Sequence, residues 1–328
     1  MPAIDVPQFE GTGSRAPSPE SRTHGITRVS LAELIALRAR SGKPALRATR
    51  ATVAMAGGHQ SRLRGRGMDY AESRVYQPGD DVRCIDWRRT ARSGRWHTKL
   101  FQEEREQQQL VLLDTNTTMR FGTRVRFKSV AAARAAAWWA WTGVRGGDRV
   151  GAAAFGAIRD AQVPHAGSRG ALAVVGALVR WDEQACAAPT GARTHESLSL
   201  ALQRVQRLLI PGSRAMLVSD GWCVDAAARA AMAQVAARVD LRVAIVIDAL
   251  ERDPAAPGVF AFESDAGRTS VDLTSAAARG RFREQLGEGW QGLANLCDEV
   301  GVAWTLLAAG SEPDLPLTQL WRAARRRR

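Results

Sequence analysis

The sequence predicts an α/β fold, in which a mostly parallel sheet carries helices on both faces and an N-terminal extension adds hairpin strands. Three observations lead to this class: short apolar runs that end in aspartate, alanine-rich helical segments between them, and the regular alternation of the two. Strands that are apolar throughout are typical of a sheet covered on both sides. The composition, 45% hydrophobic and 24% charged over 328 residues, is that of an ordinary globular protein.

The elements are expected in the following order. A short helix is expected at 30–40, because Ser30 is a good N-cap and Glu33 stands at the capping-box position. Residues 45–107 look like loops and hairpin strands rather than an independent core. Beyond them, the pattern predicts strands at 108–114, 148–156, 213–221, 241–249 and 302–309, and helices at 127–145, 168–182, 196–209, 225–238 and 275–300.

These patterns divide the chain into four segments. Residues 1–28 are rich in Pro, Ser, Gly and Thr and are expected to be disordered. Residues 29–107 form the extension, and residues 108–312 form the sheet domain. Residues 313–328 are expected to form a C-terminal helix with an arginine tail.

Basic residues outnumber acidic ones and give a formal net charge of +13. Of the 46 basic residues, only Lys43, Lys99 and Lys128 are lysines. Five arginines, Arg322 and Arg325 to Arg328, lie at the end of the chain. Such a tail either is solvated and disordered, which is the expectation, or contacts nucleic acid or anionic lipid.

The sequence also indicates the cellular location of the protein and the state of its cysteines. No run of about 18 apolar residues occurs, so no membrane span is expected. The N-terminal stretch lacks the apolar core of a signal peptide, and a cytoplasmic location is therefore expected. Cys84, Cys186, Cys223 and Cys297 lie far apart, so reduced thiols are expected rather than a zinc site or a disulfide framework.

Two of the apolar strands end in aspartates, Asp114 and Asp220, that are candidates for a binding site. Ligands of open α/β sheets gather at the carboxyl ends of the strands. In DTNTTM, Asn116 and Thr118 follow Asp114 at alternate positions, so several oxygens can point at one hard cation. The alternative is that Asp114 and the threonines cap the turn after the strand.

This pattern resembles the metal-ion-dependent adhesion site of von Willebrand factor A domains, which is Asp-x-Ser-x-Ser, then a loop threonine and a later aspartate. The resemblance implies an Mg²⁺ or Mn²⁺ site made by Asp114, Asn116, Thr118, Thr194 and Asp220. The site is degenerate, because Asn116 and Thr118 stand where the two serines belong. A second alignment of ARTHESLSLAL places Glu196 rather than Thr194 at the loop threonine.

A second candidate region is RVYQPGDDVRCIDWRRTAR, residues 74–92, where aspartates alternate with arginines. Pro78 and Gly79 fit a type II turn, with glycine at the position that requires a positive φ. The charges suit a carboxylate acid/base site, a nucleic-acid patch or an ion-paired lattice. The lattice is expected, because arginines beside aspartates keep them ionised, and the aspartates would repel phosphate. Its apolar side chains are expected to be buried against the sheet: Tyr76, Ile85 and Trp87.

With GRGMDY before it and TKLFQEE after it, this stretch closely resembles the signature of domain-of-unknown-function family 58, a bacterial von Willebrand A-like family. The resemblance covers most of residues 30–310. Its signature positions, read as partner-binding or structural, are Arg74, Tyr76, Gly79, Asp80, Asp81, Arg83, Asp86 and Trp87. Members of the family commonly accompany MoxR-type AAA+ ATPases, which implies an adaptor or cochaperone that matures or remodels a client protein.

No phosphate loop, nucleophile elbow or His-Glu-x-x-His pair occurs in the chain. A non-enzymatic interaction module is therefore expected, with the ATPase and an unknown client as partners and no specific nucleic acid. The docking face is expected around Asp114, Thr118 and Asp220. Two alternatives stay open: a metal-dependent hydrolase that uses Asp80, Asp81 and Asp86, and an arginine-tailed binder of nucleic acid or of a membrane surface.

Overall fold

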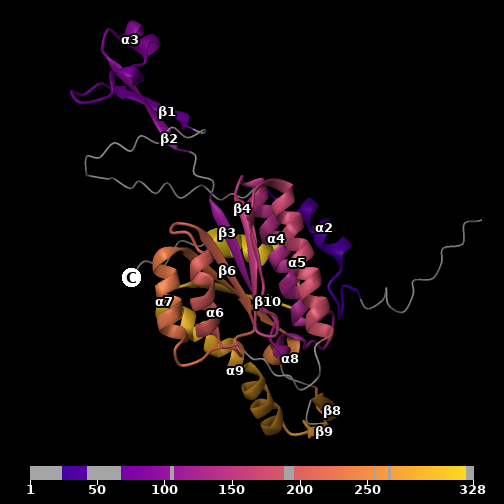
Figure 1. Cartoon of the computed structure of the whole chain (residues 1–328). Coiled ribbons are helices and arrows are strands. Elements are labelled where there is room, and N and C mark those ends of the chain that lie inside the picture. Colours follow the sequence, from indigo (N-terminus) through magenta and orange to yellow (C-terminus); the bar gives the residue numbers. More distant parts are fainter. Residues whose placement is uncertain are drawn as a thin grey trace, which may run out of the picture. The chain divides into compact units, whose positions relative to one another are not determined.

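The structure, a computed structural model, describes residues 24–42, 68–103, 107–187, 196–253, 256–264 and 267–322. The chain forms two compact units, one from Met1–Leu46 with Gln107–Arg328 and one from Arg47–Glu106. We call the first the sheet unit and the second the hairpin unit, and each is described by itself (Figure 1).

A six-stranded sheet in the order β10-β7-β6-β3-β4-β5 forms the centre of the sheet unit (Figure 1). All neighbours pair in parallel except β4 and β5, which are antiparallel. The strands are β3 (Gln108–Asp114), β4 (Arg149–Phe155), β5 (Ala161–His165), β6 (Arg214–Ser219), β7 (Asp240–Ile247) and β10 (Ala303–Ala308). The fold class predicted from the sequence is confirmed, and the five parallel strands end at one edge of the sheet, the carboxyl edge.

Helices cover both faces of this sheet, which explains why its strands are apolar throughout. Along β3, Val111 and Leu113 belong to the core on one face, whereas Leu110 and Leu112 belong to the core on the other. The first face is covered by α2 (Leu31–Arg40), α4 (Lys128–Arg145), α5 (Gly167–Ala187) and α10 (Asp314–Arg322). The second face is covered by α6 (Leu198–Val205), α7 (Ala228–Arg238) and α9 (Ala276–Val300).

Helix α4 lies centrally on the first face, where its alanines let it approach the strands and its tryptophans fill the space beside it. Trp139 stacks on Trp321 of α10, with ring centroids 4.0 Å apart. Trp141 donates its indole N–H to the carbonyl of Leu34 in α2 at 2.9 Å. These contacts place the segment 30–40, which the sequence groups with the extension, in the sheet unit.

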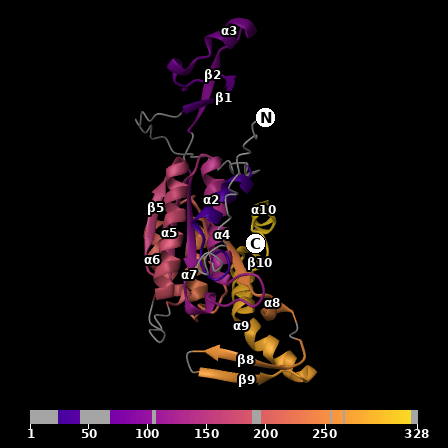
Figure 2. The same cartoon turned by 90° about the vertical axis from the view of Figure 1, so that its right-hand side faces the viewer.

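The hairpin unit is built on two antiparallel strands, β1 (Met68–Val75) and β2 (His97–Glu103). Between them the chain forms a short 3₁₀ turn, η1 (Val82–Cys84), and the helix α3 (Trp87–Ser93) (Figure 2). Gly94 ends α3 in the left-handed conformation, as is common after helices.

The structure adds elements that the sequence does not predict. Strand β5 contains Pro164, which cannot donate to a ladder and is tolerated here because β5 is an edge strand. A separate antiparallel pair, β8 (Val259–Ser264) and β9 (Gly267–Asp272), precedes α9. The helix expected at 196–209 is the shorter α6 followed by the 3₁₀ turn η3 (Gln206–Leu208). Within the described segments, no helix has both the length and the hydropathy of a membrane span.

Candidate functional site

Three aspartates stand where adjacent strands reach the carboxyl edge of the sheet. Asp114 is the last residue of β3, Asp220 follows β6, and Asp248 follows β7. Because β3, β6 and β7 are neighbours, these carboxylates form a row. All three are buried, with 1%, 1% and 2% of their surface exposed. Buried carboxylates require donors or cations around them, so the partners of each one determine what this edge can bind.

Asp114 is surrounded by donors from the protein itself. Its Oδ1 accepts from the backbone N–H of Asn116 at 2.9 Å and from Asn116 Nδ2 at 2.8 Å, and its Oδ2 accepts from the Ser219 hydroxyl at 2.6 Å. Burial, together with the negative charge of Asp220, raises the pKa of Asp114 to about 7, although these hydrogen bonds oppose the rise. Its protonated form is therefore favoured more than that of an exposed aspartate.

Asp220 is paired with a buried lysine. Lys128, the first residue of α4, places its Nζ 2.8 Å from Asp220 Oδ2 and 2.6 Å from Glu251 Oε1. Lys128 is 1% exposed, and its Nζ also lies 5.6 Å from the centre of the Phe121 ring. Burial alone would lower the pKa of Lys128, but Asp220 and Glu251 outweigh it and raise the pKa. The lysine therefore stays charged.

Asp248 caps the short helix α8 (Ala249–Arg252), Glu251 lies within it, and both extend the network. Asp248 caps α8 by accepting from the Leu250 N–H at 2.9 Å, and Glu251 Oε2 accepts in return from the Asp248 N–H at 2.8 Å. Asp248 also accepts from the backbone N–H of Thr123 at 3.0 Å. The loop between β3 and α4 is thereby joined to the end of β7.

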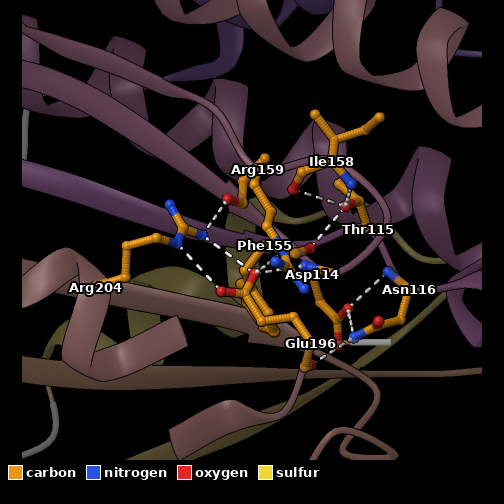
Figure 3. A network of polar contacts seen from close by, with 10 residues as sticks. Asp114, Thr115, Asn116, Phe155, Ile158, Arg159, Glu196 and Arg204 are labelled. Carbon is orange, nitrogen blue, oxygen red and sulfur yellow. Dashed lines mark hydrogen bonds and ion pairs between the residues drawn. The ribbon is translucent and has the colours of Figure 1, made fainter. Parts of the chain in front are cut away.

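Glu196 occupies the loop beside Asp114 and Asn116 (Figure 3). Its Oε2 accepts from the Gly156 N–H at 3.1 Å, and its Oε1 pairs with Arg204 Nε at 3.1 Å (Figure 3). Asn116 Nδ2 donates to its main-chain carbonyl at 3.4 Å. Thr194, the predicted loop ligand, lies outside the described residues. Glu196 is thus an arginine-paired carboxylate that fixes the loop to β4.

The predicted cation site can now be compared with these contacts. Asn116 Oδ1 and Thr118 Oγ1 are buried without a hydrogen-bond partner, which suits a ligand role. However, Asp114 and Asp220 are already held by protein donors, and an ammonium group lies against Asp220. Across the described ranges, no three His, Cys, Asp or Glu side chains gather as metal ligands. The residues as they stand do not fit a divalent cation, and the Mg²⁺ or Mn²⁺ site stays a prediction.

The signature aspartates of the hairpin unit have structural partners. The Asp80 N–H donates to the Gln77 carbonyl at 3.0 Å, and Gly79 has a φ of 105°, as the predicted turn requires. Asp80 accepts from the Gln77 N–H at 2.9 Å and pairs with Arg74 at 2.7 Å. The Gln77 N–H first, and Arg74 second, hold the pKa of Asp80 below its usual value.

Asp81 and Asp86 each cap a helical turn. Asp81 accepts from the Arg83 N–H at 2.9 Å at the start of η1. Asp86 accepts from the Ser73 hydroxyl at 2.7 Å and from the Arg89 N–H at 3.1 Å at the start of α3. The Ser73 hydrogen bond, and then that of Arg89, lower the pKa of Asp86. The described contacts give these aspartates structural roles.

The apolar signature residues differ in how far they are buried. Ile85 is buried in the hairpin unit, and Tyr76 meets Trp96 edge to face with ring centroids 5.7 Å apart. Trp87, in contrast, is 67% exposed. Their burial against the sheet stays a prediction.

Three residues of the carboxyl edge are not predicted from the sequence: Lys128, Asp248 and Glu251. Lys128 could have been found, because it is one of three lysines among 46 basic residues and opens an apolar helix. Asp248 ends the apolar run IVID, as Asp114 and Asp220 end theirs. Glu251 stands three residues after Asp248, which is the capping-box spacing, so it too could have been found.

The raised pKa of Asp114 predicts a pH dependence of stability. Because its folded-state pKa is about 7 against an ordinary 3.8, Asp114 contributes stability that is fully present below pH 4 and is lost as pH rises through 7. The melting temperature of Asp114→Asn should fall less between pH 5 and 8 than that of the wild type. Asp80→Asn is the control, because the lowered pKa of Asp80 places its titration below this window. Equal slopes for Asp114→Asn and wild type would contradict this assignment.

Comparison with protein families identifies the class of this chain. The model of the family "Protein of unknown function DUF58" matches residues 72–289, about two thirds of the sequence. The chain therefore belongs to this family. Its sheet, mostly parallel with one antiparallel edge strand, has the architecture expected from the sequence.

Among curated proteins, the chain is 38% identical over 96 residues to the uncharacterised proteins Rv1480 of Mycobacterium tuberculosis (strain ATCC 25618 / H37Rv) and Mb1516 of Mycobacterium bovis. That match covers 29% of this chain and 30% of each relative. It spans less than a third of their length.

Three solved structures are similar to this chain at low identity. The protein BatB from Bacteroides thetaiotaomicron has a TM-score of 0.37 and 11% identity, over 65% of this chain and 96% of that one. An aerotolerance-related membrane protein from Bacteroides fragilis has a TM-score of 0.35 and 16% identity, over 59% of this chain and 98% of that one. A von Willebrand factor type A protein from Catenulispora acidiphila has a TM-score of 0.32 and 13% identity, over 59% of this chain and 44% of that one.

Proposed function

We propose that this chain is a non-enzymatic interaction module, a cytoplasmic adaptor or cochaperone that works with a MoxR-type AAA+ ATPase on a client protein. Membership of the DUF58 family supports the ATPase as partner, through the association that the family resemblance implies. The contacts of the strand-end carboxylates argue against a catalytic role for these residues. Asp114, Asp220 and Asp248 are each buried and engaged by the protein's own donors.

The observation that carries the proposal is an exposed surface on the hairpin unit. Trp87 is 67% exposed and Trp96 is 55% exposed, and both lie on neighbouring segments, since the Asp86 N–H donates to the His97 carbonyl at 2.7 Å. Val75 and Val82 are also exposed there. The arginines on α3 and just after it are exposed: Arg88, Arg89, Arg92 and Arg95. We call these eight residues the aromatic–arginine surface.

The chemistry of this surface suits a protein partner. Tryptophan and arginine are the residues that most often dominate binding energy at protein interfaces. Exposed indole rings offer large apolar area, and the flanking guanidinium groups favour an acidic rim on the partner. The occupant we assign is therefore an acidic patch with an apolar pocket on the ATPase.

This assignment replaces the docking face expected from the sequence. Asp114 and Asp220 are 1% exposed, so a partner cannot contact their carboxylates directly. A charge reversal at Asp220 would leave Lys128 and the reversed side chain buried together, and would damage the fold rather than test docking.

The test is the affinity of the purified full-length chain for a co-encoded MoxR-type ATPase, measured by calorimetry. Trp87→Ala should weaken binding by about 2 kcal/mol or more, which is about 30-fold, as for a central interface residue. Its melting temperature should stay at the wild-type value, because Trp87 is exposed. Leu315→Ala in α10 is the matched control, since Leu315 is also 67% exposed, and it should bind as the wild type does.

Three outcomes would contradict the proposal. The first is no binding by the wild type, and the second is equal binding by wild type and Trp87→Ala. The third is salt-sensitive retention on single-stranded nucleic acid in place of protein, since exposed tryptophan and arginine can also stack on bases. A metal-dependent hydrolase is not favoured, because its three aspartates are engaged in structural contacts. Asp80 pairs with Arg74 at the turn, and Asp81 and Asp86 cap the first turns of η1 and α3.

A further inference from the structure

We propose that the ammonium group of Lys128 is the cation of the carboxyl edge, built into the chain beside Asp220, where the resemblance implies a divalent metal. The inference rests on the contacts of Lys128 and is independent of the proposed function. It assigns a role to a residue that neither the family pattern nor the sequence motif contains.

The position of the ammonium group supports this role. Lys128 Nζ lies between two carboxylates from different strand ends, 2.8 Å from Asp220 Oδ2 and 2.6 Å from Glu251 Oε1. Asp220 is the later aspartate of the predicted cation site. The Phe121 ring, 5.6 Å from Nζ, covers the group with a face that attracts cations. The lysine thus contacts one of the two aspartates that the predicted metal would contact, together with Glu251.

Charge and shape explain why this cation is a lysine. Lys128 neutralises one of the two carboxylates that it bridges, and its side chain is 1% exposed. A compact ammonium group with three donors fits between two carboxylates, whereas the planar guanidinium group is larger and forked. In a chain whose basic residues are otherwise almost all arginine, a lysine at this position is the smaller cation where space is limited.

Removal of the lysine should open this position to a metal ion. The two carboxylate oxygens would then face an empty space that a hard cation can enter. Their contacts of 2.6 and 2.8 Å to Nζ are longer than the about 2.0–2.1 Å of Mg²⁺ and close to the about 2.3–2.6 Å of Ca²⁺. Lys128→Ala should therefore acquire a divalent-cation site, and Ca²⁺ should fit it with less rearrangement than Mg²⁺.

The first test observes Lys128 directly in the wild-type full-length chain. With ¹⁵N at Nζ of lysine alone, the three lysines give three ammonium signals. One signal should persist at neutral pH through slow proton exchange, because a buried, ion-paired ammonium group is shielded from water. It should be retained in the double variant Lys43→Arg with Lys99→Arg, and millimolar Mg²⁺ should leave it unchanged. Loss of this signal on adding Mg²⁺, or rapid exchange of all three signals, would overturn the proposal.

The second test measures cation binding by calorimetry and by melting temperature, using MgCl₂, MnCl₂ and CaCl₂ separately. The wild type should show no heat of binding and no shift with any of them. Lys128→Ala should melt at a higher temperature with CaCl₂, and adding Glu251→Gln should remove most of that gain, because one ligand is lost. A wild type that is stabilised by Mg²⁺ or Mn²⁺, with the effect lost in Asp114→Ala, would contradict the proposal. So would a folded Lys128→Ala that none of the three ions stabilises.

Discussion

Replacing Lys128 with methionine is expected to lower the free energy of unfolding by about 3–5 kcal/mol, the cost of removing one partner of a buried ion pair. Methionine has a similar length and is apolar, so packing changes little while the charge is lost. Asp220 and Glu251 then remain buried without their cation. Urea unfolding of the variant and the wild type, followed by circular dichroism, gives the difference.

Two further variants show whether the loss comes from the orphaned charges. Adding Glu251→Gln to Lys128→Met should restore part of the stability, because one of the two uncompensated carboxylates is removed. Lys99→Met, at a lysine that is only partly buried, should change the free energy of unfolding far less. A Lys128→Met protein as stable as the wild type would show that the ammonium group does not stabilise the fold.

The second large effect is expected at Gly221, directly after Asp220. Gly221 has a φ of 89°, and a Cβ built there would lie 2.1 Å from the main-chain oxygen of Gly289 in α9. Gly221→Ala should therefore lower the free energy of unfolding by about 2–6 kcal/mol, since left-handed strain costs about 1–3 and overpacking about 1–3 kcal/mol. Thermal unfolding of the purified variant measures the effect.

Helix α9 supplies a matched control for this experiment. A Cβ at Gly292, three residues after Gly289 in the same helix, meets nothing within 4 Å. Gly292→Ala should raise the stability by about 0.5–1 kcal/mol, because alanine loses less backbone entropy in a helix. If Gly221→Ala were as mild as Gly292→Ala, the strand-end loop would not be fixed by its close approach to α9.

The central sheet could be predicted because its signal is carried by uninterrupted apolar strands. QQLVLLD and SRAMLVSD are buried on both faces, and such short apolar runs are typical of strands covered by helices on both sides. Strand β5 could not be found in this way, since an edge strand with a proline lacks that pattern. The β8–β9 pair lies outside the six-stranded sheet, and the short run VFAF at the start of β8 is its main apolar signal.

The site was predictable only in part. The rule that parallel strands end together brought Asp114 and Asp220 to one edge, and the structure places them there. The sequence could not show which donors surround each carboxylate, because Lys128 and Glu251 come from segments that are distant along the chain from Asp220. The metal site that the resemblance implies stays a prediction, and the ammonium group beside Asp220 is not part of that pattern.

The signature residues of the hairpin unit were likewise predictable only in part. The alternation of aspartate and arginine predicted a lattice, and the Arg74–Asp80 pair and the two caps fit that expectation. Nothing in the local sequence distinguishes an apolar side chain that packs inside from one that faces outward. Ile85 and Trp87, two residues apart, differ in this respect.

The most direct test of docking through the aromatic–arginine surface is photo-cross-linking in the native cell, with a photoreactive phenylalanine analogue in place of Trp87. A covalent adduct with an AAA+ ATPase is expected from position 87, and none from the equally exposed position of Leu315. An adduct with nucleic acid alone, or a cross-link from position 87 only to the chain's own sheet unit, would contradict docking of the ATPase at this surface.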